Sequence, residues 1–390
     1  MTGCLACGEG SLIQFADLGE IPVLCGVHYA TREEALASPL GRMVLGSCPN
    51  CAYVRNLAFD PRIMVYDTTM DTNLHHSAAF RSFSTDLVKG LAQRHELAGR
   101  VVLDVGCGQG EFLRELCEQT GASGFGYDPM YAGVPGPDAS GAHFVTGRAP
   151  LAEPGALPGF DFVTSRHWFE HEADPYEFLS ALRDRAGDRE VHGYIEVPDA
   201  GYDLATAGWE VIYPHVSYFD SVALAAIVER AGWRVSAEGT WFSGMFRYVE
   251  FATGPRSAYA SVPADRFEAR DRHLAAIEGF AGRHRDELER WQGTLARLRA
   301  TGARPVLWGA GSRGVQFLTQ VDPKGELSAV VDVNPRKWGR FLPVTGHRVD
   351  SPETLSEVRP GAVIITNPAY TAEISQSLAD LGISAEILVA

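Results

Sequence analysis

The 390-residue sequence lacks any apolar run near the roughly 18–20 residues that a membrane-spanning helix needs. Its opening residues, MTGCLACGEG, contain neither the basic segment nor the apolar segment of a secretory signal. Basic residues are also in short supply, since the formal net charge is −15. A protein that binds the phosphate backbone of DNA or RNA needs a basic face. These absences predict a cytoplasmic protein that acts on a small molecule, with neither a membrane nor a nucleic acid as partner.

Cysteine is nearly absent beyond residue 51, and four of the cysteines before that point form two C-x-x-C pairs, Cys4 with Cys7 and Cys48 with Cys51. A disulfide framework is not expected in a chain without a secretory signal. Two such turns can place four thiolates around one zinc ion, and a filled tetrahedral shell describes a structural site. Free thiols or a redox pair are the alternatives. A segment this small buries too little apolar surface to fold firmly without the metal.

A glycine-rich turn follows an apolar segment in VVLDVGCGQGEFL, residues 101–113. The apolar segment predicts a buried strand, and EFLRELCEQTG predicts an amphipathic helix after the turn. The glycines follow a G-x-G-x-G spacing that differs from the G-x-G-x-x-G of dinucleotide-binding proteins, and Asp104 precedes them where it would repel a pyrophosphate. S-adenosylmethionine (SAM) carries no phosphate and has a cationic amine that Asp104 can bind. Asp128 ends the next predicted strand, where an acid can accept hydrogen bonds from ribose hydroxyls.

These features predict a SAM site whose ligands are Asp104, Gly106, Gly108, Gly110 and Asp128, together with His167 at a later strand end. The segment LDVGCGQG resembles motif I of the class I SAM-dependent methyltransferases, and Asp128 resembles their ribose-binding acid. A cysteine knuckle, a methyltransferase domain and a second glycine-turn domain, in that order, resemble the nucleotide-deoxysugar C-methyltransferases of antibiotic biosynthesis over nearly the whole chain. Neither feature specifies the acceptor.

The length exceeds that of one ordinary domain, and we predict an α/β fold with three domains joined by a helix. Residues 1–65 form the small zinc-binding domain, and residues 66–255 form a doubly wound, Rossmann-like SAM domain. Residues 256–302 form a helical linker, in which apolar residues recur at three- and four-residue steps from Phe267 to Leu298. A kink is expected there at Gly279 or Gly282. Residues 303–390 form a second, smaller Rossmann-like domain.

The second glycine turn, in PVLWGAGSRGVQFL, has Gly309, Gly311 and Gly314 at dinucleotide spacing, and Asp332 ends the following predicted strand. Taken alone, this pattern would suggest NAD. Residues 303–390, however, predict only one short βαβ unit and a tail, with no second half to hold a nicotinamide. We therefore favour a contribution to binding a nucleotide-bearing acceptor, with NAD binding and a purely structural role as alternatives. In the family that the chain resembles, the acceptor lies between this domain and the central one.

Methyl transfer needs alignment and, for a nucleophile that carries a proton, a base. Polar residues gather near the predicted strand ends in RHWFEHEADP, YIEVPD and GWEVIYPHVSYF, and before the SAM domain in TNLHHSAAF. The catalytic candidates are His171, His215, Glu196 and Tyr213. The acceptor-binding candidates are His76, Ser77 and Tyr218.

The family resemblance places His171 in a Glu-His motif after the fourth strand and His215 in a second such pair. Here Pro214 stands where the family usually has a glutamate that is thought to serve as base. Either His215, Glu196 or Glu210 replaces that base, or the methylated atom is an oxygen or a nitrogen that needs less help.

The sequence thus predicts a SAM-dependent methyltransferase acting on a small polar metabolite, with a sugar or nucleotide-deoxysugar of specialised metabolism as the leading acceptor. One alternative is an O- or N-methyltransferase of a non-sugar natural product. A second is an NAD-dependent oxidoreductase, against which Asp104 argues. A third is a zinc-dependent interaction module with an inactive methyltransferase fold, which the intact acids Asp104 and Asp128 disfavour.

Overall fold

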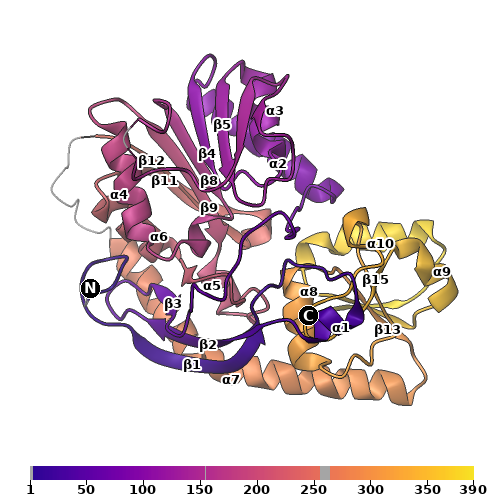
Figure 1. Ribbon diagram of the computed structural model, residues 1–390. Coiled ribbons are helices and arrows are strands. Elements are labelled where there is room, and N and C mark those ends of the chain that lie inside the picture. Colours follow the sequence, from indigo (N-terminus) through magenta and orange to yellow (C-terminus); the bar gives the residue numbers. More distant parts are fainter. Residues whose placement is uncertain (1–2, 154, 255–263) are drawn as a thin grey trace.

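The computed structural model describes residues 3–153, 155–254 and 264–390, which build three β-sheets and the helices that cover them (Figure 1). The predicted α/β fold is confirmed, with a small N-terminal sheet and two Rossmann-like sheets. No helix among the described residues is both long enough and apolar enough to cross a membrane.

The N-terminal sheet is antiparallel and has the strand order β1-β2-β3-β10. Its elements are β1 (Ile13–Pro22), α1 (Arg32–Leu36), β2 (Leu40–Ser47), β3 (Val54–Asn56) and β10 (Ser217–Tyr218). The last strand comes from the predicted SAM domain, and the hydroxyl oxygens of Tyr53 and Ser217 lie 2.6 Å apart across this pair. The first residues of the chain therefore depend on the central domain to complete their sheet.

The central sheet has the order β11-β12-β9-β8-β4-β5-β7-β6, with parallel strands from β9 to β7 and antiparallel strands at both edges. Its strands are β4 (Val101–Val105), β5 (Ser123–Asp128), β6 (Gly136–Pro137), β7 (Ala142–Thr146), β8 (Phe162–Arg166), β9 (His192–Pro198), β11 (Arg234–Trp241) and β12 (Phe246–Ala252). Its helices are α2 (Ala78–Arg94), α3 (Glu111–Thr120), α4 (Pro175–Ala186), α5 (Ala200–Asp203) and α6 (Ser221–Arg230).

Both faces of the central sheet are buried, because successive side chains of a strand point to opposite faces. On β4, Val102 packs in a cluster with α2 and α3, whereas Leu103 and Val105 pack in a cluster with α4 and α6. The polar residue of this strand, Asp104, is left near its carboxyl end, where ligands bind in open parallel sheets.

The C-terminal sheet is entirely parallel, with the order β15-β14-β13-β16-β17. Its strands are β13 (Pro305–Trp308), β14 (Ala329–Val331), β15 (Val349–Asp350), β16 (Ala362–Ile365) and β17 (Glu386–Val389), and its helices are α8 (Ser312–Val321), α9 (Leu355–Val358) and α10 (Thr371–Asp380). The expectation of one βαβ unit plus a tail was wrong. The sequence pattern missed β15, which has two residues, and β17, whose residues are only partly buried.

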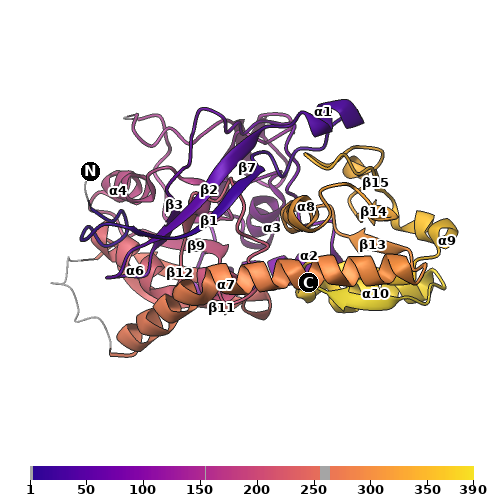
Figure 2. The ribbon, with the colours of Figure 1, turned by 90° about the horizontal axis from the view of Figure 1, so that it is seen from below.

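The predicted long helix is α7 (Ala264–Ala300), which runs beneath all three domains and continues through Gly279 and Gly282 (Figure 2). Its residues Ile277 and Phe280 pack against the N-terminal sheet, and Trp291 and Leu295 pack against the C-terminal domain. At 1.5 Å per residue such a helix is roughly 55 Å long, so it can brace two domains at once. The start of the predicted linker, residues 256–263, lies outside the described residues.

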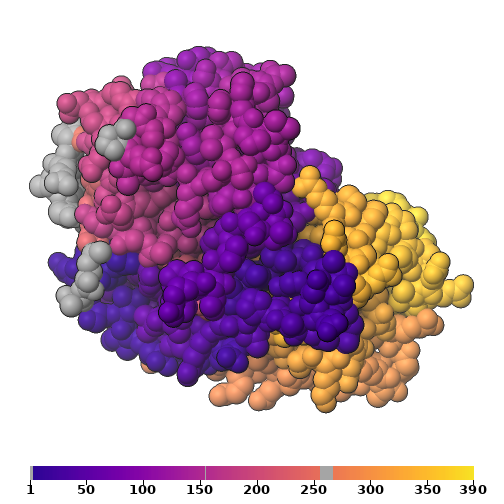
Figure 3. All heavy atoms as spheres, in the orientation of Figure 1, coloured from indigo at the N-terminus to yellow at the C-terminus, as the bar shows by residue number. Residues whose placement is uncertain are grey.

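The N-terminal segment also reaches the C-terminal domain (Figure 3). Tyr29 forms an isolated β-bridge with Phe341, and the Nε2 atom of His28 lies 3.0 Å from the carbonyl oxygen of Ala310 in the second glycine turn. The three domains therefore meet at one junction.

Candidate functional site

A cavity of about 350 Å³ lies at the junction of the three domains. Its wall contains residues of both glycine turns, including Gly106 and Gly108 of the first turn and Gly309 and Gly311 of the second. This volume falls in the range of about 300–1,000 Å³ that is usual for small-molecule sites. The two turns that the sequence singled out thus contribute to a single cavity.

The first turn requires its glycines. Gly106, Gly108 and Gly110 have φ values of +81°, +56° and +86°, in the left-handed region that other residues rarely adopt. A Cβ atom at Gly106 would lie 2.3 Å from the Cβ atom of Trp168, whereas one at Gly108 would meet no protein atom within 4 Å. Gly108 lines the cavity, so its missing side chain leaves room for a ligand beside the backbone.

Two buried carboxylates flank this turn. Asp104 accepts a hydrogen bond of 2.6 Å from the hydroxyl group of Thr164, and Asp128 accepts one of 2.8 Å from the backbone N–H of Gly108. Burial raises the pKa of each carboxyl group to about 6. Both carboxylates line the cavity, and a cation or a hydroxyl donor that bound there would favour their ionised forms.

Two histidines and a glutamate form a second polar group in the cavity wall. The rings of His171 and His215 have centroids 5.0 Å apart, and His215 Nε2 lies 3.9 Å from Glu170 Oε1. Both carboxyl oxygens of Glu170 and the Nδ1 atom of His215 are buried without a hydrogen-bond partner among the described residues. Burial lowers the pKa of each histidine to about 3 and raises that of Glu170 well above its ordinary value.

Two family models match the chain. One, described as a methyltransferase domain, matches residues 75–238, and the other, described as a C-methyltransferase C-terminal domain, matches residues 256–386. The chain is a class I SAM-dependent methyltransferase. The second match identifies the C-terminal domain as one of the kind found in C-methyltransferases.

Two solved structures with detectable similarity are methyltransferases. Magnesium protoporphyrin IX methyltransferase from Synechocystis, with S-adenosylhomocysteine bound, is 18% identical over 45% of this chain and 84% of that one, with a TM-score of 0.34. 1,6-Didemethyltoxoflavin-N1-methyltransferase from Burkholderia thailandensis is 14% identical over 54% of this chain and 95% of that one, with a TM-score of 0.34. At this level of similarity neither structure bears on the acceptor. No curated protein matches the methyltransferase.

Three of the catalytic and acceptor-binding candidates do not line the methyltransferase's cavity. Tyr213 lies against Gly41 of the N-terminal sheet, and its hydroxyl oxygen accepts a hydrogen bond from the backbone of Asp60. Tyr218 is buried and donates to the carbonyl oxygen of Ile212. Neither geometry supports the predicted roles of Tyr213 in catalysis and Tyr218 in acceptor binding.

Glu196 is fully buried and lies 3.0 Å from the guanidinium of Arg166 and 3.2 Å from Nε2 of His167. Although burial opposes its charge, Arg166 and His167 hold the pKa of this carboxyl group at about 2. The predicted role of Glu196 as a base is therefore not supported, because the carboxylate is engaged with Arg166 and His167.

The remaining catalytic and acceptor-binding candidates line the cavity, as do all the cofactor-binding candidates except Gly110. His167 has a φ of +52° and its ring packs on Phe246 at 4.4 Å between centroids. Ser77 caps the first turn of α2 and donates a hydrogen bond of 2.6 Å to Glu373 of α10. His76 is half-buried beside it.

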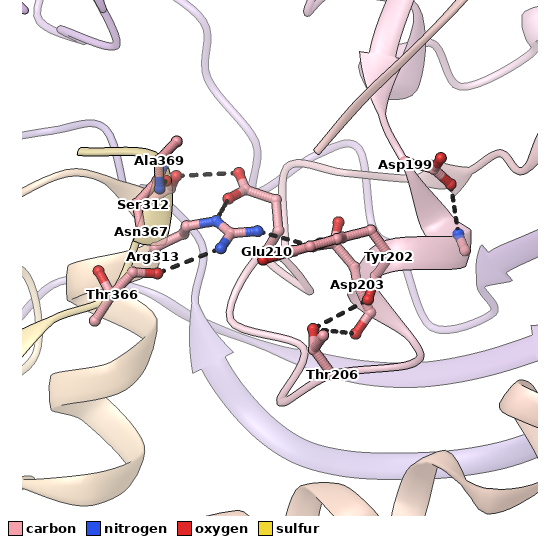
Figure 4. A network of polar contacts seen from close by, with 11 residues as sticks. Asp199, Tyr202, Asp203, Thr206, Glu210, Ser312, Arg313, Thr366, Asn367 and Ala369 are labelled. Carbon is pink, nitrogen blue, oxygen red and sulfur yellow. Dashed lines mark hydrogen bonds and ion pairs between the residues drawn. The ribbon is translucent and has the colours of Figure 1, made fainter. Parts of the chain in front are cut away.

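The second glycine turn is occupied by groups of the protein itself (Figure 4). Glu210, from the central domain, accepts hydrogen bonds from the side chains of Ser312 and Arg313 in the first turn of α8. Asp332 accepts a hydrogen bond of 2.7 Å from the backbone of Ala310 and one of 3.0 Å from Lys337 Nζ. In dinucleotide-binding proteins the pyrophosphate binds at the start of this helix and the acid binds ribose. Here carboxylates from the chain take part of that space.

The four cysteines predicted to bind metal come together. Cys4 Sγ lies 3.7 Å from Cys51 Sγ, and Cys7 Sγ lies 3.8 Å from Cys48 Sγ. Four sulfurs at about 2.3 Å from one ion form a tetrahedron with edges of about 3.8 Å. The cluster therefore fits a tetrahedral metal ion.

Several residues of the cavity wall escaped the sequence analysis, namely Tyr66, Arg166, Arg313 and Lys337. The hydroxyl group of Tyr66 lies 3.2 Å from His171 Nδ1. Tyr66 and Lys337 lie in segments without a periodic pattern that could have pointed to them. Arg166 is next to His167 at a strand end, and that position could have identified it as a candidate site residue.

Proposed function

We propose that the methyltransferase methylates a carbon atom of a nucleotide-linked deoxysugar in specialised metabolism. The observation that carries this proposal is the shared cavity: a glycine turn suited to SAM lies at one end, and the C-terminal domain lies at the other. The match of that domain to C-methyltransferases supports carbon as the methylated atom.

For the cofactor we propose that Asp104 binds the methionyl ammonium group and that Asp128 binds ribose hydroxyls, with Gly106, Gly108 and Gly110 allowing close approach. Bound SAM supplies an electrophilic methyl group. The open space at Gly108 and the buried, singly hydrogen-bonded carboxylate of Asp104 support this placement. His167, which lines the same wall, borders the cofactor.

For the base we propose His215. In methylation beside a ketone, the base removes a proton from carbon, and the electron pair of the broken C–H bond then forms the new bond to the methyl group. Pro214 removes the carboxylate usual in the family, and Glu196 is engaged by Arg166 and His167. His215 has a ring nitrogen without a partner, whereas His171 Nδ1 lies 2.8 Å from the carbonyl oxygen of Pro214. His171 therefore positions the acceptor, together with His76 and Ser77.

For the nucleotide we propose the C-terminal end of the cavity. Lys337 and Asn334 line it, and Lys337 has Asp332 as its partner there. A lysine in such a wall can bind phosphate as a point charge. Within this proposal residues 1–65, 66–255, 256–302 and 303–390 act as the zinc-binding domain, SAM domain, linker and acceptor domain of a cytoplasmic enzyme. The metal proposed for the four cysteines is zinc.

The test uses a panel of nucleotide-linked keto-deoxysugars in D₂O without SAM, followed by NMR. We expect the wild-type enzyme to exchange the proton beside the ketone for deuterium and, once SAM is added, to place a methyl group on that carbon. The variant H215N should do neither. Methylation on oxygen or nitrogen, or exchange that survives in H215N, would contradict the proposal.

A further inference from the structure

A buried arginine lies at the carboxyl end of β8, next to the strand that carries Asp104. β8 and β4 pair in parallel with Asp104 opposite Thr164, so Arg166 lies at the same edge of the sheet. The Arg166 side chain is 8% exposed and lines the cavity. Because a buried charge is costly unless it is paired, the partners of this guanidinium indicate its use.

One side of the Arg166 guanidinium is held by Glu196. Nε donates a hydrogen bond of 3.1 Å to Glu196 Oε1. Glu196 is fixed in turn, because its second oxygen accepts a hydrogen bond of 2.7 Å from the hydroxyl group of Tyr194. The carboxylate that seemed from the sequence to be a candidate base thus anchors an arginine.

The guanidinium also packs against the helix that follows the first glycine turn. Its central carbon lies 4.5 Å from the ring centroid of Phe112, in the first turn of α3 directly after the glycines. The Nη2 atom is 3.0 Å from Glu196 Oε1 but is not aligned to donate to it. This buried nitrogen therefore has no hydrogen-bond partner in the part of the chain that the structure describes.

The positions of Arg166 and Asp104 suit a ligand that carries both a cation and an anion. Arg166 is close enough to Asp104 to lower the pKa of that carboxyl group against the effect of burial. An amino-acid zwitterion presents an ammonium group and a carboxylate on one carbon. Arginine binds carboxylates through two parallel N–H groups, a geometry that lysine cannot reproduce.

We propose that Arg166 binds the methionyl carboxylate of SAM while Asp104 binds the ammonium group, and that Glu196 is a positioning residue for Arg166. The inference rests on the cofactor placement proposed above. The arginine of the segment SRHWFEH thus has a role in cofactor recognition, beside the roles proposed for the histidines of the same segment.

The test compares ligands that differ only in the carboxylate. Affinities of SAM and of decarboxylated SAM are measured by calorimetry for the wild type and for R166Q. A charge-assisted pair in a buried site is worth about 10- to 100-fold in affinity, so we expect the wild type to prefer SAM by that factor. R166Q should bind both ligands alike, and E196Q should show a reduced preference because the guanidinium is no longer fixed.

Two controls separate this role from a structural one. Methylthioadenosine lacks the amino-acid group, and it should bind equally well to the wild type and to R166Q if the fold is intact. The variant R148Q removes an exposed arginine that is paired with Glu172 outside the cavity wall, and it should keep the full preference for SAM. If R166Q fails to bind methylthioadenosine, the preference is read from R166K, where it should fall at least about threefold because the paired geometry is lost.

Three results would overturn the inference. In the first, the variant retains the preference for SAM. In the second, it loses affinity for both ligands by the same factor. In the third, only the KM for the acceptor rises, which would place Arg166 on the acceptor. A wild-type protein that binds none of these nucleosides would overturn the cofactor placement itself, and the role of Arg166 with it.

Discussion

The link between the central and C-terminal domains centres on one buried cation, and its removal has a calculable cost. Arg313 Nη2 lies 2.8 Å from Asp203 Oδ1, and Nε lies 2.6 Å from Glu210 Oε2 (Figure 4). Burial opposes the charge of Arg313, but Glu210 and Asp203 hold its pKa above the ordinary value. Burial also raises the pKa of Asp203, and Arg313 opposes that rise. The variant R313M would remove this opposition, so the pKa of Asp203 should rise further and favour its protonated form in the folded state.

That protonation sets an upper limit on the pH-dependent part of the free energy of unfolding that R313M loses. An aspartate has an ordinary pKa of about 3.9, so keeping Asp203 protonated at pH 7 costs about 4 kcal/mol relative to the unfolded chain. At pH 5 the same step costs about 1.5 kcal/mol. A protonated Asp203 has a raised folded-state pKa, so its contribution to stability is lost as the pH rises. The deficit of R313M should consequently grow from about 1.5 kcal/mol at pH 5 to as much as about 4 kcal/mol at pH 7.

Equilibrium urea denaturation of the wild type and R313M at both pH values measures this difference. The double variant D203N/R313M removes the stranded carboxyl group and should recover most of the loss at pH 7. The variant R313K keeps the charge but can reach fewer oxygens, so its free energy of unfolding should lie between those of the wild type and R313M. A deficit that is the same at pH 5 and pH 7 would show that Asp203 is not its source.

Three further outcomes are expected. Affinity for S-adenosylhomocysteine should fall as the pH drops through about 6, because only the ionised form of Asp104 pairs with an ammonium group. The variant D104N should bind this ligand weakly at every pH. Calorimetry that shows no pH dependence for the wild type would contradict this. Elemental analysis should find about one zinc ion per chain, and none in C48S; a metal-free protein with unchanged melting would exclude a structural metal. H215N should lose roughly 10²- to 10⁴-fold in turnover with cofactor affinity preserved. When SAM is saturating, burial keeps His215 neutral above about pH 4, so the turnover rate should show no inflection near the ordinary histidine pKa of about 6.5. An inflection there would contradict a buried, neutral His215.

The sequence was sufficient for features that are local in the chain. The first glycine turn, Asp104 and Asp128 could be recognised because a strand, a turn and a helix within about 30 residues fix the positions of all three. The end of β8 also pointed to the cavity for His171, whereas His215 reaches the cavity from the loop before β10. A strand end locates a Cα atom, however, and does not reveal what the side chain pairs with. Glu196 was misread for that reason.

Other features depend on contacts between distant segments. Tyr213 and His215 are two residues apart, yet the ring of Tyr213 lies against Gly41 in another sheet while His215 lines the cavity. Strand β10 pairs with β3, although their residues are about 160 positions apart in the sequence, and no periodic pattern encodes such a pairing. The N-terminal region with the four cysteines was accordingly predicted as a separate domain, although its sheet is completed by the central domain.

The two glycine turns show what a fingerprint does and does not establish. In both, the glycines meet a backbone requirement: a Cβ atom at Gly314 would lie 2.1 Å from the carbonyl oxygen of Gly309, much as one at Gly106 would collide with Trp168. The ligand is decided by what else reaches the turn. At the first, Asp104 accepts a hydrogen bond from Thr164 and lines the cavity, as does Arg166. At the second, Glu210 from another domain already lies at the start of α8. The same kind of turn therefore favours a cationic ligand in one domain and domain docking in the other.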